Sequence, residues 1–355
     1  MRTPAYMSPT SLKTFEGNID EAYLKYLAET RAPRLPQTAP MSVGSAFDAY
    51  VKSYLHFALF GNYGDSDAYA KESIFEKQVE PHNRDWAKLA GQHTFNVYKT
   101  CGALADLMLE LGTAVNKPRF EFELLGAIET HIGDVPLLGK PDIYFINGEG
   151  ARVILDWKVN GYCGKSTTSP MPGYIMIRDG WLPSEKKASS GNRMPHKDCF
   201  PTPFKGLKIN TMAFMDNLNE EWAAQLSIYS WLLGEEIGSQ DLIVGIDQIV
   251  GQPSGAVIVH KESALRPGEL IHRDFEHRVP WLRVASHRLK VNASYQFDLQ
   301  NRLAEMWGRI TSGHIFKELS REESDGRCRM LEEQAAMLAD KDDPMSDFIN
   351  SMRTQ

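Results

Sequence analysis

The sequence predicts an α/β protein in which a sheet is flanked by helices, and three observations lead to this fold class. Residues 8–115 carry apolar side chains at helical spacing, residues 118–158 alternate as strands do, and residues 219–310 return to helices and strands. The chain has 355 residues, 42% of them hydrophobic, which is enough to bury a core without disulfides. A disordered chain is therefore excluded.

The N-terminal part is expected to be mostly helical. Ser8 or Ser11 can cap a first helix, which ends before the three prolines of residues 31–40. Two further amphipathic helices are expected over residues 45–55 and about 85–111, where apolar side chains recur near a period of 3.6.

The pattern changes to that of strands after Pro118. Residues 119–128 alternate apolar and acidic side chains, residues 131–146 contain a turn and a second strand, and residues 151–159 form a third strand after a tight turn. We therefore expect three adjacent antiparallel strands.

The C-terminal part returns to a helix and strands. Asn219 can cap a helix with acidic residues in its first turn. Two strands are expected over residues 241–250 and 255–261, followed by a long helix over about 279–310. The charged tail, residues 320–355, is expected to be loose.

Between these parts, residues 160–218 show no strand or helix pattern and are too many for a passive connection. From Lys158 to Lys208 nine Lys and Arg residues stand against three Asp and Glu, a local charge of about +6. The segment also contains aromatic residues, namely Tyr162, Tyr174, Trp181 and Phe200. The whole chain, in contrast, carries a net charge of −7, which argues against a protein that coats nucleic acid.

The remaining composition predicts a cytoplasmic protein without a membrane partner. The cysteines are far apart and form no C-x-x-C pair; they are Cys101, Cys163, Cys199 and Cys328. This spacing fits neither a disulfide scaffold nor a zinc site. No run reaches 18 apolar residues, and the first 15 residues resemble no signal peptide.

The residues that carry chemistry lie on the second and third predicted strands. Asp142 precedes one strand and Asp156 lies near the end of the next, so a hairpin brings the two carboxylates together. Lys158 is two residues from Asp156 and faces the same side. Two carboxylates and an amine suit Mg²⁺ and phosphodiester hydrolysis. A solvated strand end is the alternative for Asp156-Trp157-Lys158, although Asp156 follows an apolar run, where a charge needs a partner.

These residues resemble a known family. Gly139-Lys140-Pro141-Asp142, Asp156-Trp157-Lys158 and Gln225-Leu226-x-x-Tyr229 look like the motifs of the PD-(D/E)XK nuclease superfamily, in its RecB-type exonuclease branch. Ser8-Pro-Thr-Ser11-Leu12-x-x-Phe15 and Gly44-x-x-x-Asp48 resemble the N-terminal helices of that branch. The motifs occur in the family order and cover roughly residues 8 to 235.

The resemblance implies a restriction-endonuclease-like core, with a mixed central sheet flanked by helices and a long basic insertion after the catalytic strand. A single nuclease domain would then span residues 1–355. Its expected parts are a helical part (8–115), catalytic strands (118–158), the basic insertion (160–218), C-terminal core helices and strands (219–315) and the charged tail (320–355).

The resemblance also implies roles for site residues. Asp142 and Asp156 would bind Mg²⁺ or Mn²⁺, and Lys158 would be the catalytic lysine. Gln225 and Tyr229 are one helical turn apart and would contact DNA or orient the lysine; an ordinary surface Gln and an interface Tyr are the alternative.

The sequence departs from the family pattern in two places. Asp48 replaces the usual His, so it is either a metal ligand or a surface acid. Cys328 stands alone near the C-terminus, so no iron-sulfur cluster is expected. Glu121 or Glu123 would add a carboxylate from the neighbouring strand, and the sequence does not choose between them.

The chain is not expected to bind a nucleotide. Gly164-Lys165-Ser166 follows a strand, but the phosphate-binding loop requires glycine where Val159 stands. If the protein works with a recombination or helicase partner, the motor is another polypeptide.

The expected function is a metal-dependent DNA exonuclease that hydrolyses phosphodiester bonds from single- or double-stranded DNA ends, in recombination, repair or phage DNA processing. A catalytically silent DNA-binding or assembly protein on the same fold and a structure-specific endonuclease are the alternatives. The basic insertion would form a flap along DNA, or a solvated insertion with its aromatics against the core.

Overall fold

The computed structural model describes residues 1–61, 67–163, 208–217, 219–259 and 277–340. The helices, in chain order, are α1 (Pro9–Gly17), α2 (Ile19–Ala22), η1 (Tyr23–Leu27), α3 (Ala39–Phe60), η2 (Asp67–Tyr69), α4 (Lys71–Gln78), η3 (Pro81–Asn83), α5 (Arg84–Thr100), α6 (Ala103–Gly112), α7 (Glu220–Leu232), α8 (Ala293–Thr311) and α9 (Arg321–Ala339). The strands are β1 (Arg119–Phe120), β2 (Leu124–Thr130), β3 (Gly133–Gly139), β4 (Ile143–Ile146), β5 (Arg152–Asn160), β6 (Lys208–Phe214), β7 (Leu242–Val259) and β8 (His277–Lys290).

The main sheet is mixed and has the strand order β1-β4-β5-β7-β8-β6. β4 pairs with β5 antiparallel, β5 with β7 parallel, and β7 with β8 antiparallel. Residues Val153 to Trp157 of β5 are all buried, as expected for a strand with neighbours on both edges and helices on both faces. The predicted α/β class, with a mixed sheet flanked by helices, is confirmed at this level.

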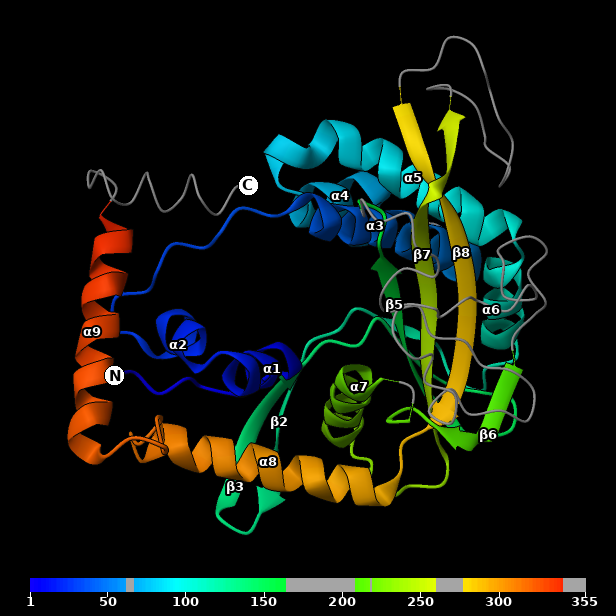
Figure 1. Ribbon diagram of the computed structural model, residues 1–355. Coiled ribbons are helices and arrows are strands. Elements are labelled where there is room, and N and C mark those ends of the chain that lie inside the picture. The colour runs from blue at the N-terminus through cyan, green and yellow to red at the C-terminus, as the bar shows by residue number, and fades with distance from the viewer. Residues whose placement is uncertain (62–66, 164–207, 218, 260–276, 341–355) are drawn as a thin grey trace.

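Helices cover both faces of the main sheet (Figure 1). On one face, apolar side chains of α3, α5 and α6 pack against Phe145, Val153 and Leu155. On the other face, α7 packs through Trp222 and Leu226 against Ile154 and the β7 strand. α7 begins where predicted, because the Asn219 side chain accepts a hydrogen bond from the main-chain N–H of Trp222 over 3.0 Å.

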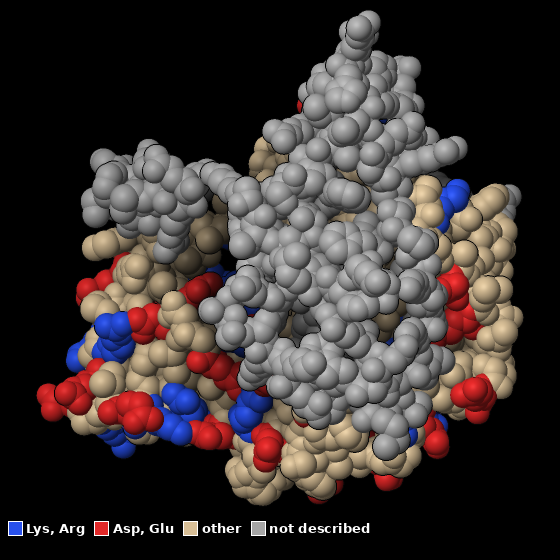
Figure 2. All heavy atoms as spheres, turned by 45° about the vertical axis from the view of Figure 1, so that its right-hand side comes forward, with Lys and Arg blue, Asp and Glu red and all other residues tan. Residues whose placement is uncertain are grey.

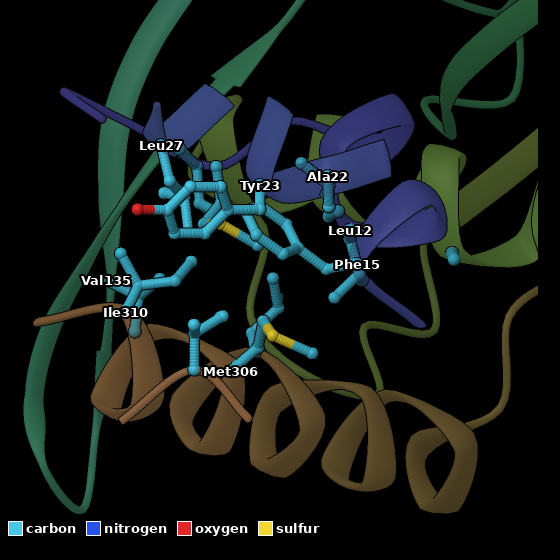
Figure 3. Close-up of a cluster of buried hydrophobic side chains, with 14 of the residues drawn as sticks. Leu12, Phe15, Ala22, Tyr23, Leu27, Val135, Met306 and Ile310 are labelled. Atoms are coloured by element: carbon cyan, nitrogen blue, oxygen red, sulfur yellow. The ribbon is translucent and has the colours of Figure 1, made fainter. Parts of the chain in front are cut away.

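A second core lies beyond α7. The β2–β3 hairpin, which is a separate two-stranded sheet, packs with α1, α2, η1, α8 and α9 around buried apolar side chains. Figure 3 shows Leu12, Tyr23 and Leu27 above α8, where Met306 and Ile310 point towards them. α7 is therefore enclosed between the main sheet and this second core.

The long helix predicted over residues 279–310 is confirmed only over residues 293–310, which belong to α8. Residues 277–290 form β8, which pairs with β7, and α8 starts only at Ala293 after the Asn292 cap. Pro280 lies within the segment, where it disfavours a helix, and Leu282 and Val284 alternate as buried strand residues. The two strands expected over residues 241–250 and 255–261 form one continuous strand, β7.

The prediction of three adjacent antiparallel strands is confirmed by β1, β4 and β5, which are neighbours in the main sheet. The first of them is shorter than predicted, and β2 and β3 leave the main sheet. The break occurs at Glu121, whose φ of 43° is rare for a residue other than glycine. Its main-chain N–H donates to the carbonyl oxygen of Asp142 over 3.0 Å. The strand predicted over residues 119–128 therefore consists of two strands that run in different sheets.

Several helix boundaries are settled or corrected by the structure; α3 covers Ala39–Phe60 rather than the predicted 45–55. Ser8, rather than Ser11, caps α1, and the two serines form a capping box. The helix expected over residues 85–111 is divided into α5 and α6 at Gly102, which has a φ of 102°. Part of the tail expected to be loose forms α9, capped by Ser320.

The predicted basic insertion lies mostly outside the described residues. Of the range 160–218, the structure describes residues 160–163 and 208–217, which include β6. The Tyr162 hydroxyl lies 3.3 Å from His93 Nδ1. On the face in Figure 2, basic and acidic side chains are intermixed over the described surface. None of the described helices has the length and apolar composition that a membrane crossing needs.

A buried polar network joins several strands of the main sheet to the helices on one of its faces. Arg288, 1% exposed, pairs with Asp247 over 2.9 Å and with Glu110 over 3.0 Å. The Tyr98 hydroxyl donates to Asp247, and the Trp157 indole donates to the Tyr98 hydroxyl over 3.4 Å. The network therefore connects α5, α6, β7 and β8 to the strand that carries Asp156.

Candidate functional site

The first pair of predicted site residues meets at one end of β4 and β5. Ile143 pairs with Leu155, so Asp142 lies beside Asp156, close enough for the charge of Asp142 to raise the pKa of Asp156. Asp142 Oδ2 also accepts a hydrogen bond from the main-chain N–H of Trp157 over 3.0 Å. Asp156 is only 4% exposed, so its interactions take place largely away from water.

Polar contacts continue from Asp156 along the face of the sheet that α7 covers, through Lys158, Gln225 and Tyr229. Lys158 forms an ion pair with Asp156 and donates to Gln225 Oε1 over 2.8 Å. The Gln225 amide nitrogen lies 3.4 Å from Asp156 Oδ1 and donates to the Tyr229 hydroxyl over 2.8 Å. The five residues predicted to be catalytic therefore form one continuous polar network.

A second group of carboxylates surrounds Lys52 of α3. Its ammonium nitrogen lies 2.8 Å from Asp142 Oδ1, 2.9 Å from Asp48 Oδ2 and 3.3 Å from Glu121 Oε2. The Lys52 side chain is 1% exposed and also lies 6.0 Å from the centre of the Trp157 ring. Asp142 thus accepts a hydrogen bond from Lys52 through Oδ1 and another from the main-chain N–H of Trp157 through Oδ2.

The structure distinguishes the two candidate glutamates. Glu123 is exposed, whereas Glu121 turns towards Lys52 at the break between β1 and β2. The Glu121 carboxylate also accepts from Gln78 Nε2 over 2.9 Å and pairs with Lys140. Its left-handed backbone conformation, which costs of order 1–3 kcal/mol in a residue other than glycine, is thus found where three side chains bind its carboxylate.

Burial and neighbouring charges move the pKa values of these acids apart. Burial, assisted by the negative charge of Asp142, raises the pKa of Asp156 to about 7 despite the neighbouring Lys158. Burial likewise raises the pKa of Asp48 to about 7. Burial also acts to raise the pKa of Asp142, but Lys52 and the Trp157 N–H outweigh it and lower that pKa. Near neutral pH, Asp142 is therefore ionised, whereas Asp156 is close to the middle of its titration.

Both lysines remain ammonium groups. Burial alone would lower the pKa of Lys158, but the Asp156 carboxylate raises it above the ordinary value. Asp142, Asp48 and Glu121 have the same effect on the pKa of Lys52, again against burial. Lys158 is thus a positive charge and a hydrogen-bond donor in this site and does not serve as a general base at neutral pH.

The site offers oxygen ligands to a divalent cation through Asp142 and Asp156. Among the described residues, no group of three or more His, Cys, Asp and Glu residues is arranged for a metal ion. Asp142 and Asp156, however, form a pair of adjacent carboxyl groups, and the buried Asp156 Oδ2 accepts no hydrogen bond from a described residue, although Lys158 is its ion-pair partner. Mg²⁺ is commonly held by one or two carboxylates together with substrate phosphates. This pair fits that requirement.

Three residues of the site were missed by sequence reasoning: Lys52, Gln78 and the main chain of Trp157. Lys52 could have been found, because it lies one helical turn after Asp48 on a predicted helix. No local pattern points to Gln78, which reaches Glu121 across 43 residues of sequence.

A surface hollow of about 920 Å³ lies elsewhere, between the N-terminus and α9, and Tyr23, Arg321 and Cys328 are among its lining residues. No residue of the carboxylate and lysine network lines it. The hollow is therefore not part of the candidate site.

Comparisons with known proteins leave the chain without a family. It matches no protein-family model and no curated protein sequence. Among solved structures it is similar to "Crystal structure of SSO0001", with 13% sequence identity, a TM-score of 0.25, and coverage of 84% of this chain and 83% of that chain. A TM-score this low does not establish a shared fold, so the site is interpreted from its own residues.

Proposed function

We propose that this chain is a metal-dependent deoxyribonuclease of the PD-(D/E)XK type that hydrolyses phosphodiester bonds, most simply as an exonuclease acting on DNA ends. The observation that carries the proposal is the continuous network of Asp142, Asp156, Lys158, Gln225 and Tyr229. The same five residues belong to the motifs that the sequence shows. A set of unrelated surface residues would not be expected to meet in one network.

Asp142 and Asp156 would hold Mg²⁺ or Mn²⁺, which would supply Lewis-acid polarisation of the phosphodiester. The Trp157 N–H fixes the orientation of Asp142. Lys158 would stabilise the negative charge that develops on the phosphoryl oxygens, because it remains an ammonium group in a largely buried position.

Gln225 would act as a positioning residue. Its carbonyl oxygen accepts from Lys158, and its amide group donates to Tyr229, so the Lys158 side chain is held in one orientation. The substrate would be DNA, and a recombination or helicase protein is a fitting partner, because the chain has no phosphate-binding loop of its own.

The test is a divalent-metal titration on end-labelled linear duplex and single-stranded DNA. We expect degradation with Mg²⁺ or Mn²⁺, none with EDTA, and none with folded Asp156→Ala or Lys158→Ala protein. Lys140→Ala is the matched control, because this lysine is 47% exposed and contacts Glu121 rather than Asp156. Unchanged cleavage by either folded site variant would refute the proposal.

A second candidate is a catalytically silent DNA-binding or assembly protein on the same fold. One observation favours it: Lys52 already forms ion pairs with the carboxylates of Asp48, Glu121 and Asp142. DNA binding that is insensitive to EDTA, without cleavage over a series of divalent metals, would support this candidate.

Linear and circular DNA substrates distinguish a structure-specific endonuclease from an exonuclease. An exonuclease degrades linear DNA and leaves covalently closed circular DNA intact, whereas an endonuclease cuts a circle that contains its target structure.

A further inference from the structure

Lys52 is the most completely paired cation of the candidate site. Its three ammonium hydrogens have three carboxylate acceptors, from Asp48, Glu121 and Asp142, between 2.8 and 3.3 Å away. An ammonium group has three donors and no acceptor, so its hydrogen-bonding capacity is used completely. At 1% exposure, the group has exchanged its water shell for carboxylate oxygens, as a bound metal ion does.

The contacts divide the carboxylates into two sets. Asp48 and Glu121 contact Lys52, whereas Asp156 contacts Lys158 and Gln225. Asp142 belongs to both sets, since its Oδ1 accepts a hydrogen bond from Lys52 and its carboxyl group lies beside Asp156. The site therefore contains two neighbouring places for a cation, and the Lys52 ammonium group occupies one of them.

Three features keep Lys52 in place. It is one helical turn from Asp48 on α3, and its ammonium group lies 6.0 Å from the Trp157 ring. Glu121, whose backbone conformation is strained, reaches it from the break between β1 and β2. Removing a buried ammonium from three carboxylates would leave uncompensated charges, which is strongly unfavourable.

We propose that Lys52 is a built-in cation that permanently takes the place of a second metal ion, so that the site holds one divalent cation, at Asp142 and Asp156. In this arrangement Asp48 and Glu121 hold Lys52 instead of binding metal, and Lys52 is a positioning residue for Asp142. The inference rests on the proposed metal-dependent function, which it deepens by assigning the number of metal ions.

The proposal is tested by counting bound cations. Isothermal titration calorimetry with Mn²⁺, on the full chain without DNA, compares the wild type, Lys52→Met and Lys140→Met. Lys140 is the matched control, because it also contacts Glu121 but is 47% exposed. We expect one Mn²⁺ in the wild type and in Lys140→Met, and two in Lys52→Met, where the vacated carboxylates become a second binding position.

Thermal unfolding gives a second readout. Without a cation, Lys52→Met is expected to unfold roughly 5–10 °C below the wild type, because three carboxylates lose their shared counter-ion. Saturating Mn²⁺ should restore most of this loss, and Lys140→Met should remain close to the wild type throughout.

The outcomes separate this proposal from the proposed function. One Mn²⁺ in both the wild type and Lys52→Met, or two in the wild type, would overturn the role of Lys52 and leave the proposed function standing. Mn²⁺ bound by Lys52→Met but not by the wild type would overturn the assignment of one divalent cation to Asp142 and Asp156, and with it the proposed metal-dependent function. No binding in either protein would overturn both.

A measurement on the wild type covers the case in which Lys52→Met does not fold. The ¹⁵N signal of the Lys52 ammonium group, assigned with the charge-retaining Lys52→Arg variant, is followed during a Mg²⁺ titration. We expect its slowly exchanging protons to persist at saturation. Rapid exchange with water on Mg²⁺ binding would show that the cation displaces Lys52, and would overturn the proposal.

Discussion

Gly139 lies directly against the ring of Tyr229: a Cβ atom at Gly139 would be 2.6 Å from Tyr229 Cδ1 and 2.7 Å from Leu232 Cδ1. Such distances are shorter than van der Waals contact, so only glycine lets the end of β3 approach α7 this closely. The glycine of the Gly139-Lys140-Pro141-Asp142 motif therefore sets the distance between that strand and the helix that carries Gln225.

We expect Gly139→Ala to destabilise the protein by about 1–3 kcal/mol, the usual cost of overpacking, and to lower DNA cleavage by moving Tyr229. Gly44→Ala is the control, since a Cβ at that position of α3 meets nothing within 4 Å; it should stabilise the protein by about 0.5–1 kcal/mol. Urea unfolding measures both. Equal effects of the two substitutions would contradict the close approach.

The raised pKa of Asp156 predicts how stability changes with pH. The pKa is about 7 in the folded protein and near 3.8 in the unfolded chain, so between these values the folded state binds more protons. Stability from this group is fully present below about pH 4 and is lost as the pH rises through 7. Asp156→Asn removes the titration, so in EDTA the variant should gain stability relative to the wild type between pH 5 and pH 8.

The expected gain is on the order of 2 kcal/mol, at 1.36 kcal/mol for each pKa unit, and it is measured by urea unfolding at the two pH values. Asp134→Asn is the control, because this side chain is exposed on the β2–β3 hairpin. A constant difference between Asp156→Asn and wild type at pH 5 and pH 8 would show that Asp156 has no raised pKa.

Gln225 and Tyr229 should differ in their effect on the rate. Gln225→Leu removes the acceptor that orients Lys158, so kcat on linear DNA should fall 10- to 100-fold, roughly as for groups that orient a metal site. Tyr229→Phe removes one acceptor of the Gln225 amide and should lower kcat by less than about 10-fold. KM should change little in both. A larger loss for Tyr229→Phe than for Gln225→Leu would contradict this order.

The buried network around Arg288 should matter for stability more than any exposed ion pair. Arg288→Met leaves Asp247 and Glu110 without their cation and should cost about 3–5 kcal/mol. Arg302→Met is the matched control, because that arginine also binds two carboxylates but is 34% exposed; its loss should cost about 1 kcal/mol or less. Thermal unfolding of the two variants is the measurement, and similar losses would contradict the role of burial.

Much of the candidate site could be predicted from sequence because several of its spacings are local. Asp156 and Lys158 share a face through the period of a strand, and Gln225 and Tyr229 share one through the turn of a helix. A short hairpin then brings Asp142 to Asp156. These relationships depend on spacings of two, four and fourteen residues, which can be read from the sequence. The contact of Gln225 with Lys158 spans 67 residues, and only the resemblance to a family predicted it.

The rest could not be predicted, because it depends on pairing between distant segments. Residues 279–290 become a strand only through their hydrogen bonds to β7, and this tertiary pairing outweighs a helical spacing of apolar residues. Lys52 meets Glu121 and Asp142 across 69 and 90 residues of sequence. The break at Glu121 likewise follows from its contacts with Asp142 and Lys52 rather than from its neighbours in the chain.

The parallel pairing of β5 with β7 also has a consequence for synthesis of the protein. Asn160 pairs with Val250, so a nascent chain carries Asp142, Asp156 and Lys158 long before the strand that completes their sheet leaves the ribosome. Until then one edge of β5 has unpaired main-chain N–H and C=O groups, and the side chains of this strand are largely apolar. Such an edge can pair with other chains during aggregation. Fragments that end between residues 160 and 241 should therefore be poorly soluble, and the acidic and basic groups of the site are fixed only late in translation.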